Sequence, residues 1–436
     1  MIPSALLIGW VAVLAVAGVI GLAGDLGVRT WVLVACALIA IVVVDAFRAF
    51  RLPVPRATRR LARAMALQTR SFVRLEFMHE LGRPSLRVKI FDHFPEVFEC
   101  DAFPMSLDIV PGEDALIVRY ECTPQLRGSW RFDGLGMRIA SPLGLWWRQV
   151  TLPVNDEVRV YPNFSTVTRS VLRAQSSPLQ QNGVHLRRQR GEGLEFHELR
   201  DYREGDSLRA LDWKATSRMG RMISRDYRDE RDQNLIFIVD AGRRMRAKDG
   251  ALSHFDHTLN ALLVLAYVAL RQGDSVGVMT VGRERAWFPP RKGAATINDI
   301  LGHVFSLEPV SEEVDYVAAA TELAVRQRRR SLVVMLTNVR DEDTEDLLRA
   351  TRSLKQRHLV MLASLRERAL DEVANEPVED LQSALTFSAT DRFLARRRKA
   401  EALMHANGVM VEDCLCDELA QAITNRYLAI KRAGML

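Results

Sequence analysis

The pattern of apolar and polar positions separates the first 50 residues from the rest of the chain. Residues 5–23 and 31–44 are apolar and uncharged, and a short polar turn, residues 24–29, lies between them. The first apolar run is long enough to cross a bilayer, and the second reaches that length if the residues beside it lie near the interface. The pattern therefore predicts a hairpin of two transmembrane helices in residues 1–50.

A secretory signal peptide is the alternative interpretation of the first apolar run. That run has no basic segment before it, and a second apolar run follows almost at once, so the helix hairpin is favoured. Several arginines follow the hairpin, most of them in a basic juxtamembrane linker at residues 51–69: Arg48, Arg51, Arg56, Arg59, Arg60 and Arg63. Beside apolar helices such a cluster favours anionic lipid of the bilayer over nucleic acid.

The same arginines predict the orientation of the chain. By the positive-inside rule, the end of the second helix lies on the cytoplasmic side of the membrane. With only a short turn outside, the N-terminus is predicted to be cytoplasmic too, so the protein is predicted to lie in the cytoplasmic membrane with two transmembrane helices and its soluble domains facing the cytoplasm.

From residue 70 to residue 162 the chain has short alternating runs broken by Gly and Pro, which predicts an antiparallel β-sandwich. The predicted strands are residues 85–91, 106–110, 115–121, 128–132, 136–140 and 157–161. An aromatic-rich corner at residues 143–147 is interpreted as sandwich core, with a partner-binding patch as the alternative. Cys100 and Cys122 are expected to be reduced thiols, although a reversed topology would suit a disulfide between them.

After a polar connector, residues 163–190, and a charged stretch, residues 191–232, strands alternate with helices in residues 233–436. The predicted strands are residues 235–240, 275–281, 331–337, 358–364 and 409–413, with 286–288 as a hairpin partner, and the predicted helices are 255–272, 294–305, 314–328, 343–356, 390–406 and 418–433. This alternation predicts a doubly wound α/β domain whose largely parallel sheet is covered on both faces. Ligands bind such sheets at the carboxyl ends of the strands, which here carry Asp240, Thr337, Asn338 and Ser364.

Composition agrees with a multidomain, ordered protein. A chain of 436 residues has room for two or three domains, and 48% hydrophobic with 26% charged residues is typical of globular proteins. Five cysteines without regular spacing do not form a disulfide framework, and Cys414 and Cys416 are interpreted as core thiols. The basic runs at residues 326–330 and 396–399 have no interleaved aromatic residues, so they are interpreted as solvated helix ends, and no nucleic-acid partner is expected.

Several enzymatic motifs are absent from the sequence. There is no G-x-x-x-x-G-K-[ST] loop, which excludes ATP binding by that route. His79 and His197 each begin H-E-x-x without the second histidine of a zinc protease. Gly191 and Gly193 follow no strand and lack the third glycine of a dinucleotide site.

Residues 205–208 spell Gly-Asp-Ser-Leu, the nucleophile block of one class of esterases. That class also needs a histidine three residues after an aspartate to act as the base, and the chain contains no such pair. The structural interpretation is that Asp206 or Ser207 is the N-cap of a helix at residues 208–213.

A dense mix of acids, arginines and aromatic residues fills the segment around these letters. Its distinctive positions are Gly193, Glu195, Phe196, Leu199, Arg200, Tyr202, Gly205, Asp206, Arg209, Asp212, Trp213, Lys214, Ser217 and Arg218. In this order they resemble the signature of the domain-of-unknown-function 58 family. The layout of that family is also similar: a two-helix membrane hairpin, a β-sandwich, the signature, and a domain like von Willebrand factor type A.

The resemblance implies an interaction protein rather than an enzyme, because no enzymatic activity is generally assigned to the family. Members are often encoded beside MoxR-type AAA+ ATPases. This implies a partnership in the assembly or maturation of other proteins, with client membrane or envelope proteins as further partners.

The signature places acidic and basic side chains around apolar ones. Phe196, Leu199 and Tyr202 are three residues apart, so they are predicted to face one side of a short helix. Arginines suit bidentate carboxylate contacts, which fix geometry when they are partly buried. One interpretation is a scaffold that docks the connector onto the α/β domain, and the other is an exposed recognition surface for a partner protein.

The resemblance also implies a Mg²⁺ site at the first strand end. Type A domains bind the ion through an Asp-x-Ser-x-Ser loop, with a Thr and an Asp from later loops. Here Asp240 matches, but Gly242 and Arg244 stand at the hydroxyl positions, and Asn338 follows Thr337 in place of the acid. The adjacent arginines would repel a dication, and Arg244 itself could pair with Asp240. The sequence predicts a degenerate site without metal, and no cofactor.

Together these features predict a non-enzymatic, membrane-anchored interaction module with no catalytic residue. The alternatives are an esterase-like hydrolase that uses Ser207 or Asp240, and a purely structural envelope scaffold.

Overall fold

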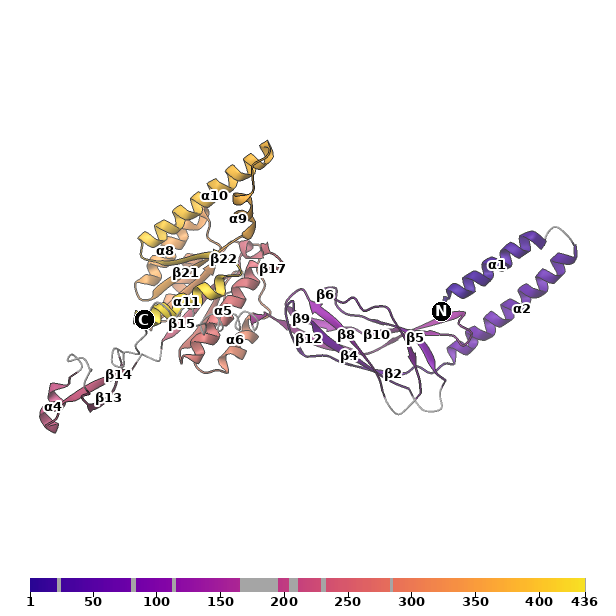
Figure 1. Cartoon of the computed structure of the whole chain (residues 1–436), viewed down its shortest axis with the longest axis horizontal. Helices are drawn as coiled ribbons and strands as arrows, with labels where there is room; N and C mark the ends of the chain where they lie inside the picture. The colour runs from indigo at the N-terminus through magenta and orange to yellow at the C-terminus, as the bar shows by residue number, and fades with distance from the viewer. Residues whose placement is uncertain are drawn as a thin grey trace. The chain divides into compact units, whose positions relative to one another are not determined.

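The computed structural model describes residues 1–21, 25–79, 84–111, 115–164, 195–203, 211–228, 233–282 and 285–435. The chain divides into two compact units, Met1–Tyr161 and Pro162–Leu436, whose elements are labelled in Figure 1. The first unit contains apolar helices and mainly antiparallel sheets, and the second contains an α/β sheet. The predicted multidomain organisation is confirmed at this level.

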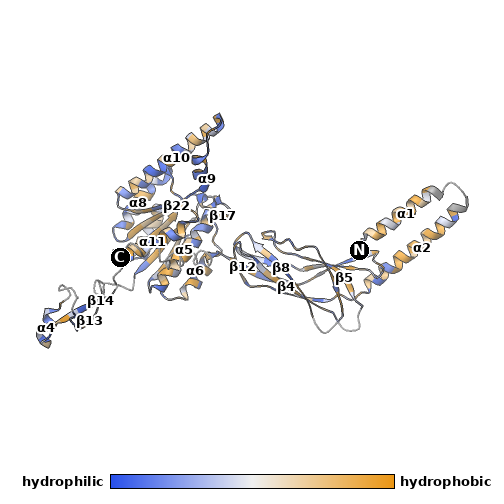
Figure 2. Cartoon of the chain, viewed as in Figure 1, coloured by the Kyte–Doolittle hydropathy of each residue, from blue (hydrophilic) through white to orange (hydrophobic). Residues whose placement is uncertain are grey.

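Two apolar helices begin the chain, α1 (Ala5–Gly21) and α2 (Asp25–Phe50). They pack closely, because Trp31 Nε1 donates to the Leu14 carbonyl at 2.8 Å, and a Cβ atom at Gly18 would lie 2.8 Å from the Trp31 ring. Most of their described residues are hydrophobic, as the orange ribbon in Figure 2 shows. Val28–Phe50 is long and apolar enough to span a membrane, whereas Ala5–Val19 is shorter. Among the described residues, one helix of membrane-spanning length is therefore present, and a second span and the orientation stay predictions.

The strands of the first unit build three sheets. They are β1 (Ile2–Pro3), β2 (Arg56–Arg60), β3 (Ala64–Ala66), β4 (Ser71–Met78), β5 (Leu86–Asp92), β6 (Phe98–Glu99), β7 (Met105–Ile109), β8 (Leu116–Pro124), β9 (Gly128–Phe132), β10 (Leu135–Ala140), β11 (Trp146–Leu152) and β12 (Asp156–Tyr161). The sheet orders are β1-β11-β10-β5-β7, β2-β4-β8-β6 and β3-β12-β9. Of the named pairings only β3 with β12 is parallel, so the predicted antiparallel character is confirmed.

Part of the predicted juxtamembrane linker is sheet. Residues 51–69 contain β2 and β3, and the side chain of Arg59 is completely buried instead of facing lipid. Its guanidinium pairs with Asp92 and, at 3.1 Å, with Asp156, and it also donates to backbone carbonyls. These acceptors come from distant parts of the sequence, so the local run of arginines could not reveal that one of them is a core residue.

The aromatic-rich corner at residues 143–147 is only partly core, which corrects its first interpretation. Leu145 is buried, but Trp146 is half-buried, and its Nε1 donates to the Val42 carbonyl of α2 at 3.0 Å. Next to it, Arg148 donates to the Phe50 carbonyl at 2.8 Å. The corner therefore joins the end of the apolar helix α2 to strand β11.

The second unit contains a six-stranded sheet. Its strands are β15 (Asn234–Asp240), β18 (Ser275–Val281), β19 (Ala286–Arg291), β20 (Leu332–Thr337), β21 (Leu359–Arg366) and β22 (Met410–Leu415), in the order β19-β18-β15-β20-β21-β22. All neighbours are parallel except β19, which runs antiparallel to β18. A short hairpin, β16 (Lys248–Asp249) and β17 (Leu252–Ser253), follows β15. The predicted α/β sheet, including its hairpin partner after β18, is confirmed.

Helices connect these strands. They are η3 (Arg243–Arg246), α5 (His254–Arg271), α6 (Thr296–Val304), α7 (Tyr316–Arg326), η4 (Asp341–Asp343), α8 (Thr344–Lys355), α9 (Arg368–Asn375), α10 (Leu381–Ala406) and α11 (Leu419–Arg432). Helix α9 was not predicted, and α10 begins nine residues before the predicted residue 390.

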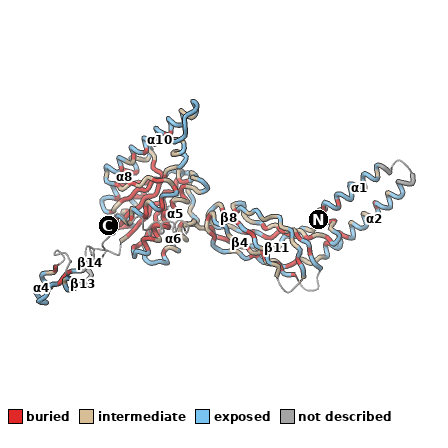
Figure 3. The backbone as a smooth tube through the Cα atoms, viewed as in Figure 1, coloured by how far each residue is buried: buried red, intermediate tan, exposed pale blue. Residues whose placement is uncertain are grey.

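The sheet is buried on both faces. Alternate residues of β15 belong to different hydrophobic clusters: Leu235 and Phe237 pack with α5, α6 and α11, whereas Ile236 and Ile238 pack with α7, α8 and α10. Figure 3 shows these strands buried along their length. Because side chains alternate across a strand, an uninterrupted apolar run is required when both faces are covered.

In the signature segment a strand of a hairpin replaces the short helix predicted around Phe196, Leu199 and Tyr202. Strand β13 (Glu195–Asp201) pairs antiparallel with β14 (Ile223–Arg228), and helix α4 (Trp213–Met219) lies between them in sequence. Leu199 lies within β13 and Tyr202 directly after it, so these two residues are not part of a helix. The cross-strand backbone ladder outweighs that local pattern.

Candidate functional site

The carboxyl edge of the parallel sheet gathers the polar residues that the sequence placed there. Asp240 ends β15, Thr337 ends β20, and Ser364 lies opposite Thr337 on β21. Thr337 contacts Asp240, while Asn338 and Ser364 contact a side chain from α10. The edge therefore holds two neighbouring polar clusters.

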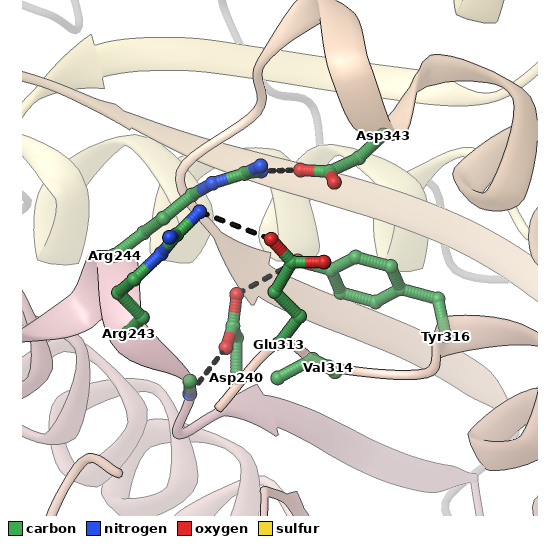
Figure 4. Close-up of a pocket in the computed structure, with 8 residues that line it drawn as sticks. Asp240, Arg243, Arg244, Glu313, Val314, Tyr316 and Asp343 are labelled. Atoms are coloured by element: carbon green, nitrogen blue, oxygen red, sulfur yellow. Dashed lines mark hydrogen bonds and ion pairs between the residues drawn. The ribbon is translucent and has the colours of Figure 1, made fainter. Parts of the chain in front are cut away.

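Asp240 is the centre of the first cluster, shown in Figure 4. Its carboxylate is buried, with the residue only 3% exposed. Oδ1 accepts a hydrogen bond from the Gly242 backbone N–H at 2.7 Å. Oδ2 accepts from the Thr337 hydroxyl at 2.6 Å and from the Tyr316 hydroxyl at 2.8 Å. Uncharged donors thus satisfy both oxygens of the buried carboxylate.

The sequence prediction did not identify Tyr316 as part of this cluster. It is the first residue of α7, directly after Asp315, whose side chain caps the helix by accepting from the Ala318 N–H at 2.8 Å. Burial and the negative charge of Asp240 raise the pKa of Tyr316 well above its ordinary value, so the hydroxyl keeps its proton and remains a donor. The one signal for it in the sequence is the helix cap Asp315 directly before the tyrosine.

Arg244 does not pair with Asp240, which corrects the expectation from the sequence. It pairs with Glu342 at 2.9 Å and with Asp343, and Arg243 pairs with Glu313 at 3.0 Å. The carboxylate already has three donors, and these acids offer the arginines partners at the protein surface. The two positive charges are therefore balanced outside the Asp240 cluster.

The geometry around Gly242 does not fit the Mg²⁺ ligand set of type A domains. A Cβ atom there would lie 2.6 Å from Val314 Cγ2 and 3.2 Å from the Glu312 carbonyl oxygen, so a serine has no room without a shift. The cavity beside Asp240 has a volume of about 20 Å³, roughly the space of one water molecule. Within the described residues no group of three or more His, Cys, Asp or Glu side chains could hold a metal.

Arg397 of α10 forms the second cluster at the same edge. This side chain is 2% exposed, so the predicted solvated helix end at residues 396–399 is wrong at this position. Arg397 donates to Asn338 Oδ1 at 2.9 Å, to the Leu365 carbonyl at 2.8 Å, and to the side chains of Ser364 and Asp413. It thereby connects the ends of β20, β21 and β22 to one helix.

Asn338 has a structural reason to be an amide where the metal-site pattern has an acid. Its Oδ1 accepts from Arg397, and its Nδ2 donates to Glu367 Oε1 at 2.8 Å. A carboxylate at this position would lose that donor and face Glu367 with a second negative charge. Asn338 is therefore matched to its neighbours and not to a cation.

Several signature residues can be placed in the hairpin. Asp212 is the N-cap of α4, where it accepts from the Ala215 N–H at 3.0 Å and pairs with Arg225 at 2.9 Å; these contacts lower the pKa of Asp212. The predicted N-cap at Asp206 or Ser207 lies outside the described residues, as do Gly193, Gly205 and Arg209. Leu211, predicted to be helical, forms a β-bridge with Ser224, so the helix starts at Trp213.

The hairpin also presents large apolar side chains to solvent. Trp213 is 69% exposed, and Leu199, Met219 and Met222 are exposed as well. Lys214, Ser217 and Arg218 lie on the same short helix and are also exposed. Exposed apolar groups beside basic ones are typical of surfaces that bind other proteins.

Comparisons with known proteins give a family and relatives without an assigned activity. Residues 198–408 match the family model described as "Protein of unknown function DUF58". The chain is 23% identical over 277 residues to the uncharacterized protein YeaD of Bacillus subtilis, which covers 61% of this chain and 63% of that protein. The chain thus aligns with less than two thirds of that relative.

Two solved structures show partial likeness. One is a cohesin module of a Clostridium perfringens family 33 glycoside hydrolase, with 13% identity and a TM-score of 0.16 over 24% of this chain and 96% of that one. The other is an uncharacterized membrane-spanning protein of Vibrio fischeri, with 12% identity and a TM-score of 0.18 over 46% of this chain and 98% of that one. No functional argument rests on either.

Proposed function

The chain belongs to the DUF58 family through residues 198–408, and on that premise we propose that it is a non-enzymatic, membrane-anchored protein-interaction module. Its partner is a MoxR-type AAA+ ATPase, as the family resemblance implies, and the pair acts in the assembly or maturation of other proteins. The α/β domain is of the von Willebrand factor type A kind, a proposal supported by its central parallel strands and its polar carboxyl edge.

The carboxyl edge of the sheet supports binding rather than catalysis. The Asp240 carboxylate is held by three donors beside a cavity of about 20 Å³, which leaves little space for a substrate. At the neighbouring strand ends, Arg397 occupies the polar groups of Asn338 and Ser364. These side chains fix the loops at the edge, and fixed loops are suited to present a surface to another protein.

One observation carries the proposal: the exposed Trp213 on the family signature hairpin. A tryptophan loses much apolar surface to water when it docks, and it is enriched among residues that dominate binding energy. Lys214 and Arg218 beside it favour a partner with acidic groups around an apolar pocket.

The experiment is a pull-down of the full-length tagged protein from detergent-solubilised membranes of the native host. Trp213→Ala is compared with Val325→Ala, a control at a 70% exposed position on α7. The AAA+ ATPase should be recovered with the wild type and with Val325→Ala, and lost with Trp213→Ala. Equal recovery of the ATPase with Trp213→Ala would contradict the proposed binding surface. Failure to recover any AAA+ ATPase with the wild type would contradict the proposed partner.

A hydrolase using Ser207 or Asp240, and a purely structural scaffold, make different predictions. Turnover of general ester or phosphate substrates by the full-length protein, abolished by Ser207→Ala or Asp240→Asn, would replace our proposal with the hydrolase. A chain that recovers no partner under any nucleotide condition would favour the scaffold.

For the location we propose two transmembrane helices, α1 and α2, in a bacterial inner membrane, with the soluble parts in the cytoplasm. The apolar α2 and the arginines at its end support this placement. Protease added to intact spheroplasts should leave the chain whole and should cut it after lysis. Cleavage in intact spheroplasts would reverse the orientation.

A further inference from the structure

Two cysteines lie close to the pairing of β6 with β8: Cys122 is part of β8, and Cys100 directly follows β6. The register pairs Phe98 with Pro124 and Glu99 with Thr123. One step further along this antiparallel register, Cys100 lies opposite Cys122. The rings of Phe103 and Tyr120 are 4.8 Å apart, so the chain continues beside β8 after Cys100.

The backbone hydrogen bonds show whether Cys100 and Cys122 form a hydrogen-bonded or a non-hydrogen-bonded cross-strand pair. The Gln125 N–H donates to the Val97 carbonyl at 2.8 Å, which makes these two residues a hydrogen-bonded pair. Because the two kinds of pair alternate along an antiparallel ladder, Cys100 and Cys122 occupy a non-hydrogen-bonded position. At such positions Cα atoms are about 4.5 Å apart and side chains are close, within the range of roughly 4.4–6.8 Å found in disulfides.

The two thiols also contact each other. A hydrogen bond between the side chains of Cys100 and Cys122 lowers the pKa of Cys122 and raises that of Cys100, so the pair favours a Cys122 thiolate beside a protonated Cys100. Cys122 is buried, whereas Cys100 is partly exposed, so a small molecule from solvent meets Cys100 first. Both cysteines are free in the structure.

The other thiols have different surroundings. Cys414 and Cys416 are both buried beside β22, so a small molecule from solvent does not reach them directly. Cys36 lies on the apolar helix α2. In the described part of the chain, Cys100 and Cys122 are thus the cysteines placed for reaction with each other.

We propose that Cys100 and Cys122 are a redox-modification site, a cross-strand dithiol that a small soluble disulfide such as oxidised glutathione converts into an intrachain disulfide. The partly exposed Cys100 thiol gives up its proton as its sulfur attacks one sulfur of oxidised glutathione, which forms a mixed disulfide and, with that proton, releases one molecule of glutathione. The Cys122 thiolate then attacks the Cys100 sulfur and releases the second glutathione. The protein loses two electrons and two protons, and one glutathione disulfide becomes two thiols.

The product would join the residue that follows the edge strand β6 covalently to β8. A cross-link closes the loop between the two cysteines and restricts the unfolded chain, so oxidation should raise the thermal midpoint of the first unit. The pair would stay reduced in a cytoplasm with a high ratio of reduced to oxidised glutathione and would close under oxidative stress.

The test uses the full-length protein in detergent with Cys36→Ser, equilibrated in glutathione mixtures of increasing oxidised fraction. Free thiols are blocked with N-ethylmaleimide, and peptides are mapped by mass spectrometry with and without dithiothreitol. We expect one dithiothreitol-sensitive peptide linking Cys100 to Cys122, loss of two free thiols, and a higher thermal midpoint. Cys122→Ser should stop at the mixed disulfide on Cys100.

The wild-type map decides the outcome even if a variant fails to fold. Glutathione retained on Cys100 while Cys122 remains open to alkylation would overturn the proposal. Cross-linking of either residue to Cys414 or Cys416, or full alkylation of both thiols at the most oxidising mixture, would overturn it equally.

Discussion

The Tyr316 hydroxyl donates a hydrogen bond to Asp240 Oδ2 at 2.8 Å, on the oxygen that also accepts from Thr337. Each hydroxyl carries one proton, so the 2.9 Å contact between the two hydroxyl oxygens adds no further donation when both protons point to the carboxylate. The three side chains come from β15, α7 and β20. A buried negative charge is thus held by neutral donors that connect three elements of the sheet edge.

Removal of the tyrosine hydroxyl should destabilise the α/β domain. Tyr316→Phe leaves a buried carboxylate with one donor fewer, and we expect the free energy of unfolding to fall by about 1–3 kcal/mol. Urea unfolding of the full-length protein in detergent, followed by circular dichroism, measures the change. Tyr267→Phe is the control, because that hydroxyl contacts the exposed Arg271 at 3.2 Å and should matter by less than about 0.5 kcal/mol. Equal stability of Tyr316→Phe and wild type would contradict the role given to this hydrogen bond.

A serine at position 242 should not restore a metal site. Its Cβ would meet Val314 Cγ2 at 2.6 Å, so Gly242→Ser should lower the free energy of unfolding by about 1–3 kcal/mol through overpacking. Adding Val314→Ala should recover part of that loss, because the methyl group in the way is gone. If the double variant loses as much free energy of unfolding as Gly242→Ser, or more, the contact with Val314 is not the cause of the destabilisation.

The wild-type protein should show no binding heat when it is titrated with MgCl₂ or MnCl₂ in a calorimeter. The reason is that both Asp240 oxygens are occupied by protein donors and Gly242 supplies no hydroxyl. Asp240→Ala gives the matched baseline. Binding that is present in the wild type and absent in Asp240→Ala would show that the site holds a cation after all.

Arg397 should be essential to the stability of the second unit. Arg397→Met removes the charged donor that Asn338, Ser364 and Asp413 share, although Ser364 keeps the Val339 N–H at 3.3 Å. The free energy of unfolding should fall by about 3–5 kcal/mol. Arg398→Met provides a control one residue away, at a side chain that is 70% exposed, and should change stability by less than about 0.5 kcal/mol. If the two substitutions changed the free energy of unfolding by similar amounts, the buried contacts of Arg397 would not be what stabilises this unit.

The sequence predicted the apolar strands well because burial on both faces leaves a continuous hydrophobic run. Strands β9 and β18 begin and end at the predicted residues. It also placed Asp240, Thr337 and Ser364 at one edge, since parallel strands share a direction. What it missed depends on partners far along the chain: Tyr316 reaches Asp240 across 76 residues.

Charged residues were the main source of error. Arg59 and Arg397 were grouped with neighbouring arginines and assigned to lipid or solvent, yet both are buried. Neighbouring residues in a run of like charges can differ in burial, because successive residues of a strand or helix point in different directions. Which arginine enters the core is decided by carboxylates such as Asp92 and Asp413, which approach only in the folded chain.

Buried histidines should make the second unit less stable in mild acid. Burial lowers the pKa of His358 below its ordinary value of 6.5, and the nearby Arg357 acts in the same direction. The unfolded chain therefore binds a proton more readily than the folded one, so stability is full above pH 6.5 and is lost as the pH falls through the folded pKa. Burial shifts the pKa of His303 the same way.

Substitution of single histidines shows which of them causes the loss of stability in mild acid. Each such histidine contributes a slope of at most about 1.4 kcal/mol per pH unit in that window. Urea midpoints measured between neutral pH and mild acid should fall in the wild type and fall less steeply in His358→Leu, which cannot take up the proton. His405→Leu is the control at an exposed position on α10 and should reproduce the wild-type slope. A profile in His358→Leu parallel to that of the wild type would mean that His358 is not protonated on unfolding in this window, and the loss would belong to other groups.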